Sequence, residues 1–217
     1  MRINIKGFLS NSFKQQRGVR QGDPLSPVLF NLALEPLLSR ILHDDSITGY
    51  QLPATPLHNY NINIKDPTQL KILAYADDCF VFIHNLHDLQ RTMLHIETYS
   101  LASNATINKD KTHAISLSGS PSSSLRTHLE SQGIRSWFDQ TSEQALVYLG
   151  YPLYHTPRQR DRFLDQLIQK IKSACDIHSQ RSLSILGRAT IVNVPILSTL
   201  WHILRVCLVL KSFFEKV

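Results

Sequence analysis

Hydrophobic residues recur at helical spacing near the start of the chain. The segment 28–42 is rich in Leu and places apolar residues three and four positions apart, which predicts an amphipathic helix. Ser26 and Pro27 stand in front of it, and they suit an N-cap followed by proline at the first helical position. Pro36 lies inside the segment, so we expect the helix to bend there or to break into two pieces.

Later segments show the same spacing. Between 88 and 102, four apolar residues fall on one helical face: Leu89, Met93, Ile96 and Tyr99. Two further helices are expected near 161–177 and 184–207. The span 191–210 is apolar enough to suggest a membrane helix, but it contains Arg205, and a central arginine alone costs roughly 2.5 to 3.5 kcal/mol on insertion. We therefore interpret this span as a buried helix.

Shorter apolar runs predict strands. Residues 3–20 alternate loosely around turn residues, as a short strand pair would. Two apolar runs, 70–76 and 79–83, are separated by Asp77 and Asp78. This arrangement predicts a tight β-hairpin with an acidic tip.

Polar segments mark the connections. Residues 49–69 are polar and contain three prolines, which indicates a loop or an irregular hairpin. A polar turn at 104–111 precedes an expected strand at 113–117. The sequence GSPSSS at 119–124 has linker composition and marks the expected seam between two parts of the chain. No internal repeat is visible.

Composition and charge fit a globular protein with a basic surface. Of the 217 residues, 42% are hydrophobic and 18% are charged, which is ordinary for a folded core. The net charge of +6 would attract a polyanion, although a merely basic soluble surface has the same balance. The cations gather in two stretches: Arg2, Lys6, Lys14, Arg17 and Arg20, and then Arg158, Arg160, Arg162, Lys170, Lys172, Arg181 and Arg188.

Neither disulfides nor a zinc site is expected. The cysteines are odd in number and far apart, at Cys79, Cys175 and Cys207, which fits a reducing compartment. The first residues lack the apolar run of a signal peptide. The histidines are scattered, and we assign no function to those near the acidic hairpin because they form no ligand pattern with an acidic partner: His84, His87 and His95.

The two carboxylates at the expected hairpin tip carry the main chemical signal. Clustered carboxylates repel each other and resist desolvation, so an apolar hairpin that presents Asp77 and Asp78 should face something positive. Mg²⁺ prefers a few carboxylate oxygens together with waters and phosphates. Two such ions roughly 3.5 to 4 Å apart can activate an attacking 3′-hydroxyl and stabilise a leaving pyrophosphate. A solvated Asp-Asp turn is the alternative for an isolated pair.

The residues around this pair are more specific. Residues 74–78 read AYADD and resemble the Tyr-x-Asp-Asp motif C of reverse transcriptases. Residues 17–27 read RGVRQGDPLSP, are followed by LFN at 29–31, and resemble motif B of the LINE-type, non-LTR retrotransposon branch. Further similarities follow in order: Ala102, Ser103, Ile107, Asn108, Lys111 and Thr112 with motif D, Tyr148, Leu149 and Gly150 with the motif E primer grip, and 181–193 with the start of the thumb.

The resemblance covers nearly the whole chain and implies an α+β fold. It implies a partial polymerase palm over 1–118, in which a ferredoxin-like sheet with packed helices carries the Asp-Asp β-hairpin. A linker and primer-grip-like segment over 119–157 and a mainly helical, thumb-like segment over 158–217 would follow. The implied activity is RNA-directed DNA synthesis by two-metal nucleotidyl transfer, with Mg²⁺ as the ion and with an RNA template, a DNA primer and deoxynucleotides as partners.

The resemblance also implies roles for single residues. Asp77 and Asp78 would bind metal, and Lys111 would approach the pyrophosphate as a cation or proton donor, with a plain surface lysine as the alternative. The other implied roles are positional: template or nucleotide contact for Arg20, Gln21, Gly22 and Pro24, packing beneath the primer end for Tyr75, and the primer grip for Tyr148, Leu149 and Gly150. For Tyr75 the alternative is an ordinary half-buried strand residue.

Motif A of the family has no counterpart in this sequence. That motif supplies a further aspartate upstream of motif B, whereas the first acidic residue here, Asp23, lies inside motif B. We therefore expect weak metal binding, an unpaired strand edge beside the hairpin and no polymerase activity from the isolated chain. The alternatives are a catalytically dead, nucleic-acid-binding remnant and a decayed element. A nuclear location would fit, since LINE-type elements prime on chromosomal DNA.

Overall fold

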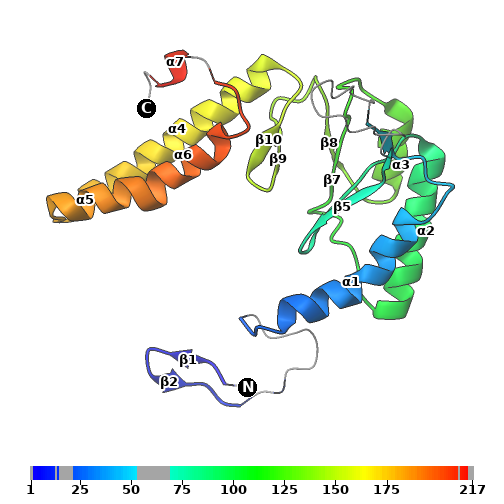
Figure 1. Cartoon of the computed structure of the whole chain (residues 1–217), viewed down its shortest axis with the longest axis horizontal. Helices are drawn as coiled ribbons and strands as arrows, with labels where there is room; N and C mark the ends of the chain where they lie inside the picture. Colours follow the sequence, from blue (N-terminus) through cyan, green and yellow to red (C-terminus); the bar gives the residue numbers. More distant parts are fainter. Residues whose placement is uncertain (1, 13, 15–21, 53–68, 210, 215–217) are drawn as a thin grey trace, which may run out of the picture. The chain divides into compact units, whose positions relative to one another are not determined.

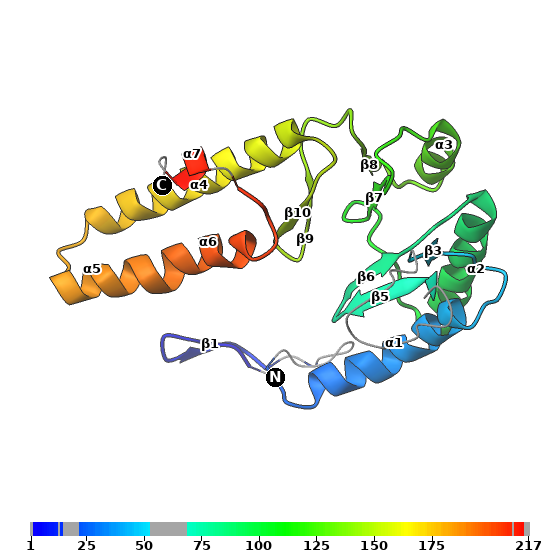
Figure 2. The same cartoon turned by 45° about the horizontal axis from the view of Figure 1, so that its top comes forward.

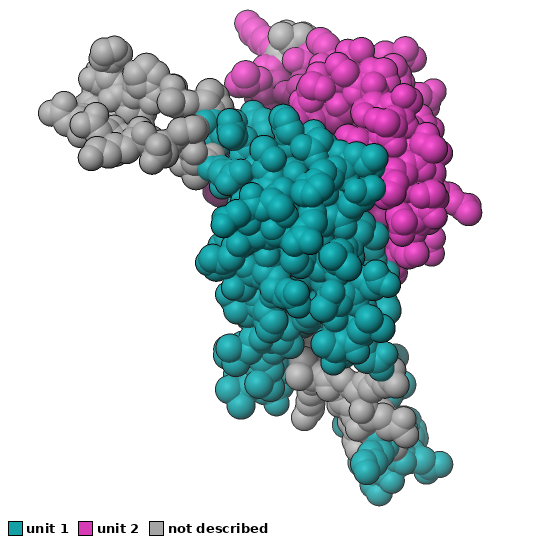
Figure 3. Space-filling model, turned by 90° about the vertical axis from the view of Figure 1, so that its right-hand side faces the viewer, with its two compact units in different colours: residues 1–107 teal, residues 108–217 magenta. Residues whose placement is uncertain are grey.

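The computed structural model describes residues 2–12, 14, 22–52, 69–209 and 211–214. Helices and short strands mix along this part of the chain, as expected for an α+β protein (Figure 1, Figure 2). The chain divides into two compact units, Met1–Ile107 and Asn108–Val217, which Figure 3 colours separately.

The first unit combines two long helices with short antiparallel strand pairs. The helices are α1 (Ser26–Leu42) and α2 (Leu86–Ser103). The strand pairs are β1 (Asn4–Ile5) with β2 (Phe8–Leu9), β3 (Tyr50–Gln51) with β4 (Gln69–Leu70), and β5 (Ile72–Tyr75) with β6 (Asp78–Val81). The early strand pair, the irregular hairpin and the hairpin around the two aspartates were all predicted.

Helix α1 runs unbroken through Pro36, so of the two expected outcomes, a bend or a break, the break is absent. Pro36 lies on the exposed side of the helix, where water can satisfy the carbonyl that loses its helical partner. The core of this unit forms on the other side, where Leu37 and Ile41 pack with Ile47. Partly buried side chains from three elements surround them: Leu34, Ile72, Ile96 and Tyr99.

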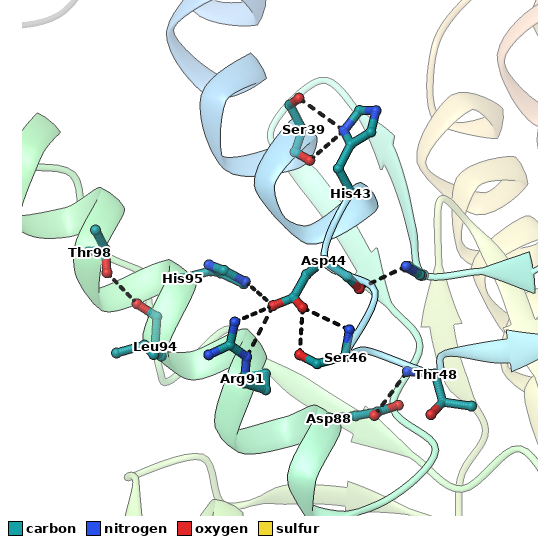
Figure 4. Close-up of polar contacts among 11 residues, drawn as sticks. Ser39, His43, Asp44, Ser46, Thr48, Asp88, Arg91, Leu94, His95 and Thr98 are labelled. Carbon is teal, nitrogen blue, oxygen red and sulfur yellow. Dashed lines mark hydrogen bonds and ion pairs between the residues drawn. The ribbon is translucent and has the colours of Figure 1, made fainter.

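Two acidic side chains fasten the segment between α1 and β3 to helix α2 (Figure 4). The carboxylate of Asp88 is fully buried and accepts hydrogen bonds from the backbone N–H groups of Thr48, Gly49 and His84. Asp44 contacts Arg91 at 2.7 Å and His95 at 2.6 Å. The sequence showed no acidic partner for His95, and the fold supplies one in Asp44.

Acid should weaken the first unit through Asp44. The hydroxyl of Ser46 foremost, and then His95 and Arg91, hold the pKa of Asp44 well below its usual range, while burial opposes them. Because the folded pKa lies below the unfolded value of about 3.9, this carboxylate stabilises the fold at neutral pH and loses that contribution as the pH falls below about 4.

The measurement is the urea midpoint of unfolding as the pH falls from about 6 to about 2. We expect Asp44→Asn to flatten this pH dependence and the matched exposed variant, Asp45→Asn, to leave it unchanged. Equal slopes in Asp44→Asn and the wild type would contradict the prediction.

The second unit opens with small strand pairs. Strand β7 (His113–Ile115) pairs in parallel with β8 (Ser136–Phe138), and helix α3 (Ser123–Ser131) lies between them in sequence. Strands β9 (Leu146–Tyr148) and β10 (Tyr151–Leu153) form an antiparallel hairpin. Because β7 pairs with a strand beyond the Ser-rich stretch at 119–124, both belong to one unit, and the boundary between units lies at 107–108.

A helical hairpin completes the second unit. Helix α4 (Pro157–Ser179) lies alongside α5 (Ile185–Ile191), the π-helical turn η1 (Val192–Ile196) and α6 (Leu197–Leu204), and the short α7 (Lys211–Phe214) follows (Figure 2). Two sets of buried side chains form its core: Leu164, Leu167, Ile168 and Ile171 from α4, and Ile196, Leu200 and Ile203 from the returning segment. These helices confirm the two predicted near 161–177 and 184–207. Within the described ranges, no helix is long and apolar enough to cross a membrane.

Every sheet in the described residues has two strands. The ferredoxin-like sheet that the resemblance implied is therefore not formed in this part of the chain. The β5–β6 hairpin keeps unpaired edges, and its apolar surface is open to solvent, since Leu73 is 48% and Tyr75 67% exposed. An unpaired edge of this kind was expected beside the aspartates.

Candidate functional site

The acidic hairpin differs in one detail from its prediction. Tyr75 pairs with Asp78, so the two-residue loop consists of Ala76 and Asp77, and Asp78 is the first residue of β6. Only one of the two aspartates therefore lies in the loop, and the other closes it. Ala76 has a φ of 52°, a left-handed backbone conformation that L-residues adopt at a cost of order 1–3 kcal/mol unless surrounding structure enforces it. Such strain is common where a turn presents functional groups.

The base of this hairpin is firmly held, whereas its tip is open. Lys71 is 6% exposed, and its ammonium group donates a 2.8 Å hydrogen bond to the backbone carbonyl of Asp44. The amide of Phe82 donates to the carbonyl of Lys71 at 2.9 Å, and the rings of Phe80 and Phe82 pack at 5.0 Å. Asp77 and Asp78 are exposed.

The electrostatic character of the tip is negative. Among the described residues, neither Asp77 nor Asp78 forms an ion pair. Burial first, and then the charges of Asp78 and Asp77, raise the pKa of the neighbouring Cys79 thiol. An exposed pair of carboxylates fits Mg²⁺, which keeps several waters and takes one or two carboxylates from protein. In the same part of the chain, no three His, Cys, Asp or Glu side chains gather as a complete metal site.

The motif-B-like segment lies only partly within the described structure. Arg20 and Gln21 lie outside the described residues, while Gly22 and Pro24 are exposed in the turn before α1. Gly22 has a φ of 87°, and a Cβ there would meet no atom within 4 Å. Its backbone conformation therefore accounts for a glycine independently of any close approach by a base.

An aspartate contributes to the start of α1, and the cap lies one residue before the expected serine. The cap position is Leu25, and Ser26 is already helical. The carboxylate of Asp23 accepts a 2.9 Å hydrogen bond from the amide of Leu25. The backbone carbonyl of Asp23 accepts a 3.1 Å hydrogen bond from the amide of Ser26. The Asp-Pro pair at 23–24, a common turn signal, would have indicated this geometry.

The two remaining predicted site segments lie in the second unit. Lys111 is exposed at the end of a tight turn, where its amide donates to the side chain and the carbonyl of Asn108. Tyr148 ends β9, and Leu149 and Gly150 form the turn into β10. His202 of α6 contacts this turn, with 3.3 Å between Nε2 and the carbonyl oxygen of Leu149. The sequence gives no signal for that contact, because the two residues are 53 positions apart.

Known proteins are similar to the chain in sequence. A family model described as reverse transcriptase (RNA-dependent DNA polymerase) matches residues 2–153. The Transposon TX1 uncharacterized 149 kDa protein of Xenopus laevis is 32% identical over 99% of the chain. Retrovirus-related Pol polyproteins from the R2 element of Popillia japonica and from R2DM of Drosophila melanogaster are 31% and 30% identical over 52% and 60% of it.

These relatives are much longer than the chain. It spans 15%, 16% and 11% of their respective lengths. No solved structure is significantly similar to it.

Proposed function

The chain belongs to the reverse transcriptase (RNA-dependent DNA polymerase) family, as a reverse transcriptase domain of non-LTR retrotransposon proteins, and from this premise we propose that it carries part of the active site for RNA-directed DNA synthesis. Reverse transcriptases use divalent metal ions and bind a template and a primer. The observation that carries the proposal is the β5–β6 hairpin, with a fixed base and two exposed carboxylates at its tip.

In this proposal Asp77 and Asp78 hold Mg²⁺. The bound ions would lower the barrier by activating the primer 3′-hydroxyl and by neutralising charge on the triphosphate of the deoxynucleotide. Two carboxylates offset only part of the charge of two divalent ions, and the described residues offer no third ligand group. We propose that a further carboxylate from another part of the whole protein completes the site.

The remaining motifs would position the nucleic acid and the nucleotide. Arg20, Gln21, Gly22 and Pro24 would contact template or nucleotide ahead of α1, and Lys111 would stabilise the leaving pyrophosphate. Tyr75, exposed beside Asp78 in the hairpin, would lie beneath the primer end. On this proposal, the chain comprises a palm-like part over 1–118, a primer-grip part over 119–157 including Tyr148, Leu149 and Gly150, and a thumb-like part over 158–217.

The experiment is primer extension with a DNA primer, deoxynucleotides and Mg²⁺. We expect the whole protein to copy an RNA template and the isolated 217-residue chain to show no template-dependent incorporation, because the described residues gather no third metal ligand beside Asp77 and Asp78. Incorporation by the isolated chain would contradict the expected division of the active site.

A nucleic-acid-binding remnant without catalysis is the second candidate function. The absence of a three-ligand group from the described residues favours it. Its signature is salt-sensitive binding of RNA or DNA by the whole protein, with no nucleotide incorporation under any divalent ion.

A further inference from the structure

The turn between β9 and β10 has a backbone conformation that needs support. Leu149 and Gly150 are its two central residues, with φ values of 50° and 85°. Two positive φ values match the turn that best joins twisted antiparallel strands, for which Asn-Gly or Gly-Gly is the usual sequence. Leucine is unfavourable in the first position because its Cβ crowds the following carbonyl. Contacts from outside the hairpin are therefore expected to hold this turn.

A single side chain supplies such contacts. The ring of His202 stacks on that of Tyr151, with centroids 4.3 Å apart and planes inclined by 29°. Its Nε2 lies 3.3 Å from the carbonyl oxygen of Leu149, and its Nδ1 lies 3.3 Å from the hydroxyl of Tyr151. One neutral tautomer satisfies both, since Nε2–H then donates to the carbonyl and Nδ1 accepts from the hydroxyl.

The contact also explains the second turn residue. A Cβ added at Gly150 would lie 3.2 Å from Nε2 of His202, which is closer than ordinary van der Waals contact. The ring thus fills the space that a side chain at this position would need. Glycine at this position therefore permits both the positive φ and the close approach of the histidine ring.

His202 links the turn to a rigid layer of the second unit. Its neighbours along α6, Leu200 and Ile203, are buried in the core shared with α4, whereas His202 itself is exposed and contributes nothing to that core. A histidine on a well-packed helix, with one ring nitrogen at the carbonyl of the strained turn and the other at the first residue of the next strand, is suited to positioning.

We infer that His202 is a positioning residue that fixes the Leu149–Gly150 turn against α6 and thereby sets where this hairpin holds the primer strand. The inference rests on the proposed function for its substrate. It deepens that function by adding a helical residue outside the motifs to the primer-binding part of the chain. The histidine acts through the turn and need not contact nucleic acid itself.

Two measurements on the whole protein test this inference. The first is hydrogen exchange of the amides at 149–151, and we expect His202→Ala to speed it about tenfold, equivalent to a lost hydrogen bond of roughly 1.4 kcal/mol. The second is steady-state primer extension, where we expect the KM for primer–template to rise about tenfold while the KM for the deoxynucleotide and the Mg²⁺ dependence stay unchanged. A merely structural role would not separate the two KM values.

Variants on the same elements give the controls. Ser198→Ala, exposed on the same helix, should match the wild type in both measurements. His202→Gln, which can still donate to the carbonyl of Leu149, should recover part of the loss. Unchanged exchange at 149–151 in His202→Ala would overturn the inference, and so would a KM effect equal for primer–template and nucleotide. If His202→Ala speeds exchange at 149–151 but the whole protein synthesises no DNA, the proposed function is contradicted and the contact between His202 and the turn is confirmed.

Discussion

Asp77→Asn in the whole protein is expected to reduce the rate of DNA synthesis about a thousandfold. Metal ions supply several kcal/mol of charge stabilisation in such reactions, and a loss of about 4 kcal/mol corresponds to three orders of magnitude in rate. Asparagine keeps the size of the side chain but removes the charge that holds the ion. The measurement is single-turnover primer extension on an RNA template at saturating Mg²⁺.

The same substitution should leave the fold intact. Asp77 lies in an exposed loop, and among the described residues it makes no ion pair that its loss would break. Surface substitutions of this kind usually change stability by less than about 0.5 kcal/mol. Asp78→Asn should likewise reduce the rate of DNA synthesis and leave the fold intact. Asp45 is another exposed aspartate in the same unit, and Asp45→Asn should keep full activity. An Asp77→Asn enzyme with more than about a tenth of wild-type rate would exclude a metal ligand at this position.

Local patterns predicted the elements well because each rests on interactions between near neighbours. The apolar face of 88–102 became α2, and the two apolar runs around the aspartates became β5 and β6. At the hairpin tip, the predicted loop was displaced by one residue: Asp77 and Asp78 were expected in it, and Ala76 and Asp77 occupy it. A turn that places alanine at positive φ goes against residue preference, so preference could not identify it.

Long-range contacts escaped prediction for a different reason. The partner of His95 is Asp44, 51 positions earlier, and His202 contacts a turn 53 positions away. Neither pair has a separation in sequence that is typical of a motif or of one helical face, because only the fold brings the side chains together. Composition pointed to the Ser-rich stretch at 119–124 as a seam, whereas the two compact units divide at 107–108, because the parallel pairing of β7 with β8 spans that stretch.

In the first unit, the contacts that stabilise the fold and the groups proposed for catalysis lie at opposite ends of the β5–β6 hairpin. Buried polar contacts gather at the base, where Lys71 reaches the carbonyl of Asp44 and α2 holds the preceding segment. Exposed acidic groups gather at the tip, in Asp77 and Asp78. A fixed base limits the positions that the tip can occupy, and metal-ion catalysis demands that its ligands be held within about 0.5 Å of their working geometry. The buried carboxylates are thus expected to matter for the site although they lie outside it.

Asp88→Ala is expected to cost the first unit about 3 to 5 kcal/mol of folding free energy, because each backbone donor left without a partner costs roughly 1–3 kcal/mol and water can reach the two that are only partly buried. The Asp88 carboxylate is fully buried and accepts amides from Thr48 and Gly49 on one side and from His84 on the other. Alanine would leave three donors without their acceptor. Urea denaturation of the 217-residue chain, followed by far-ultraviolet circular dichroism, measures the change.

The matched variants decide whether the hydrogen bonds are responsible. Asp45→Ala removes an aspartate from the exposed surface of the same segment and should change stability by less than about 0.5 kcal/mol. Asp88→Asn keeps one acceptor oxygen and places an N–H group where the second stood, so its cost should fall between the two. A change below about 1 kcal/mol for Asp88→Ala would show that water or another group replaces the carboxylate, and that this segment is not fastened to α2 through it.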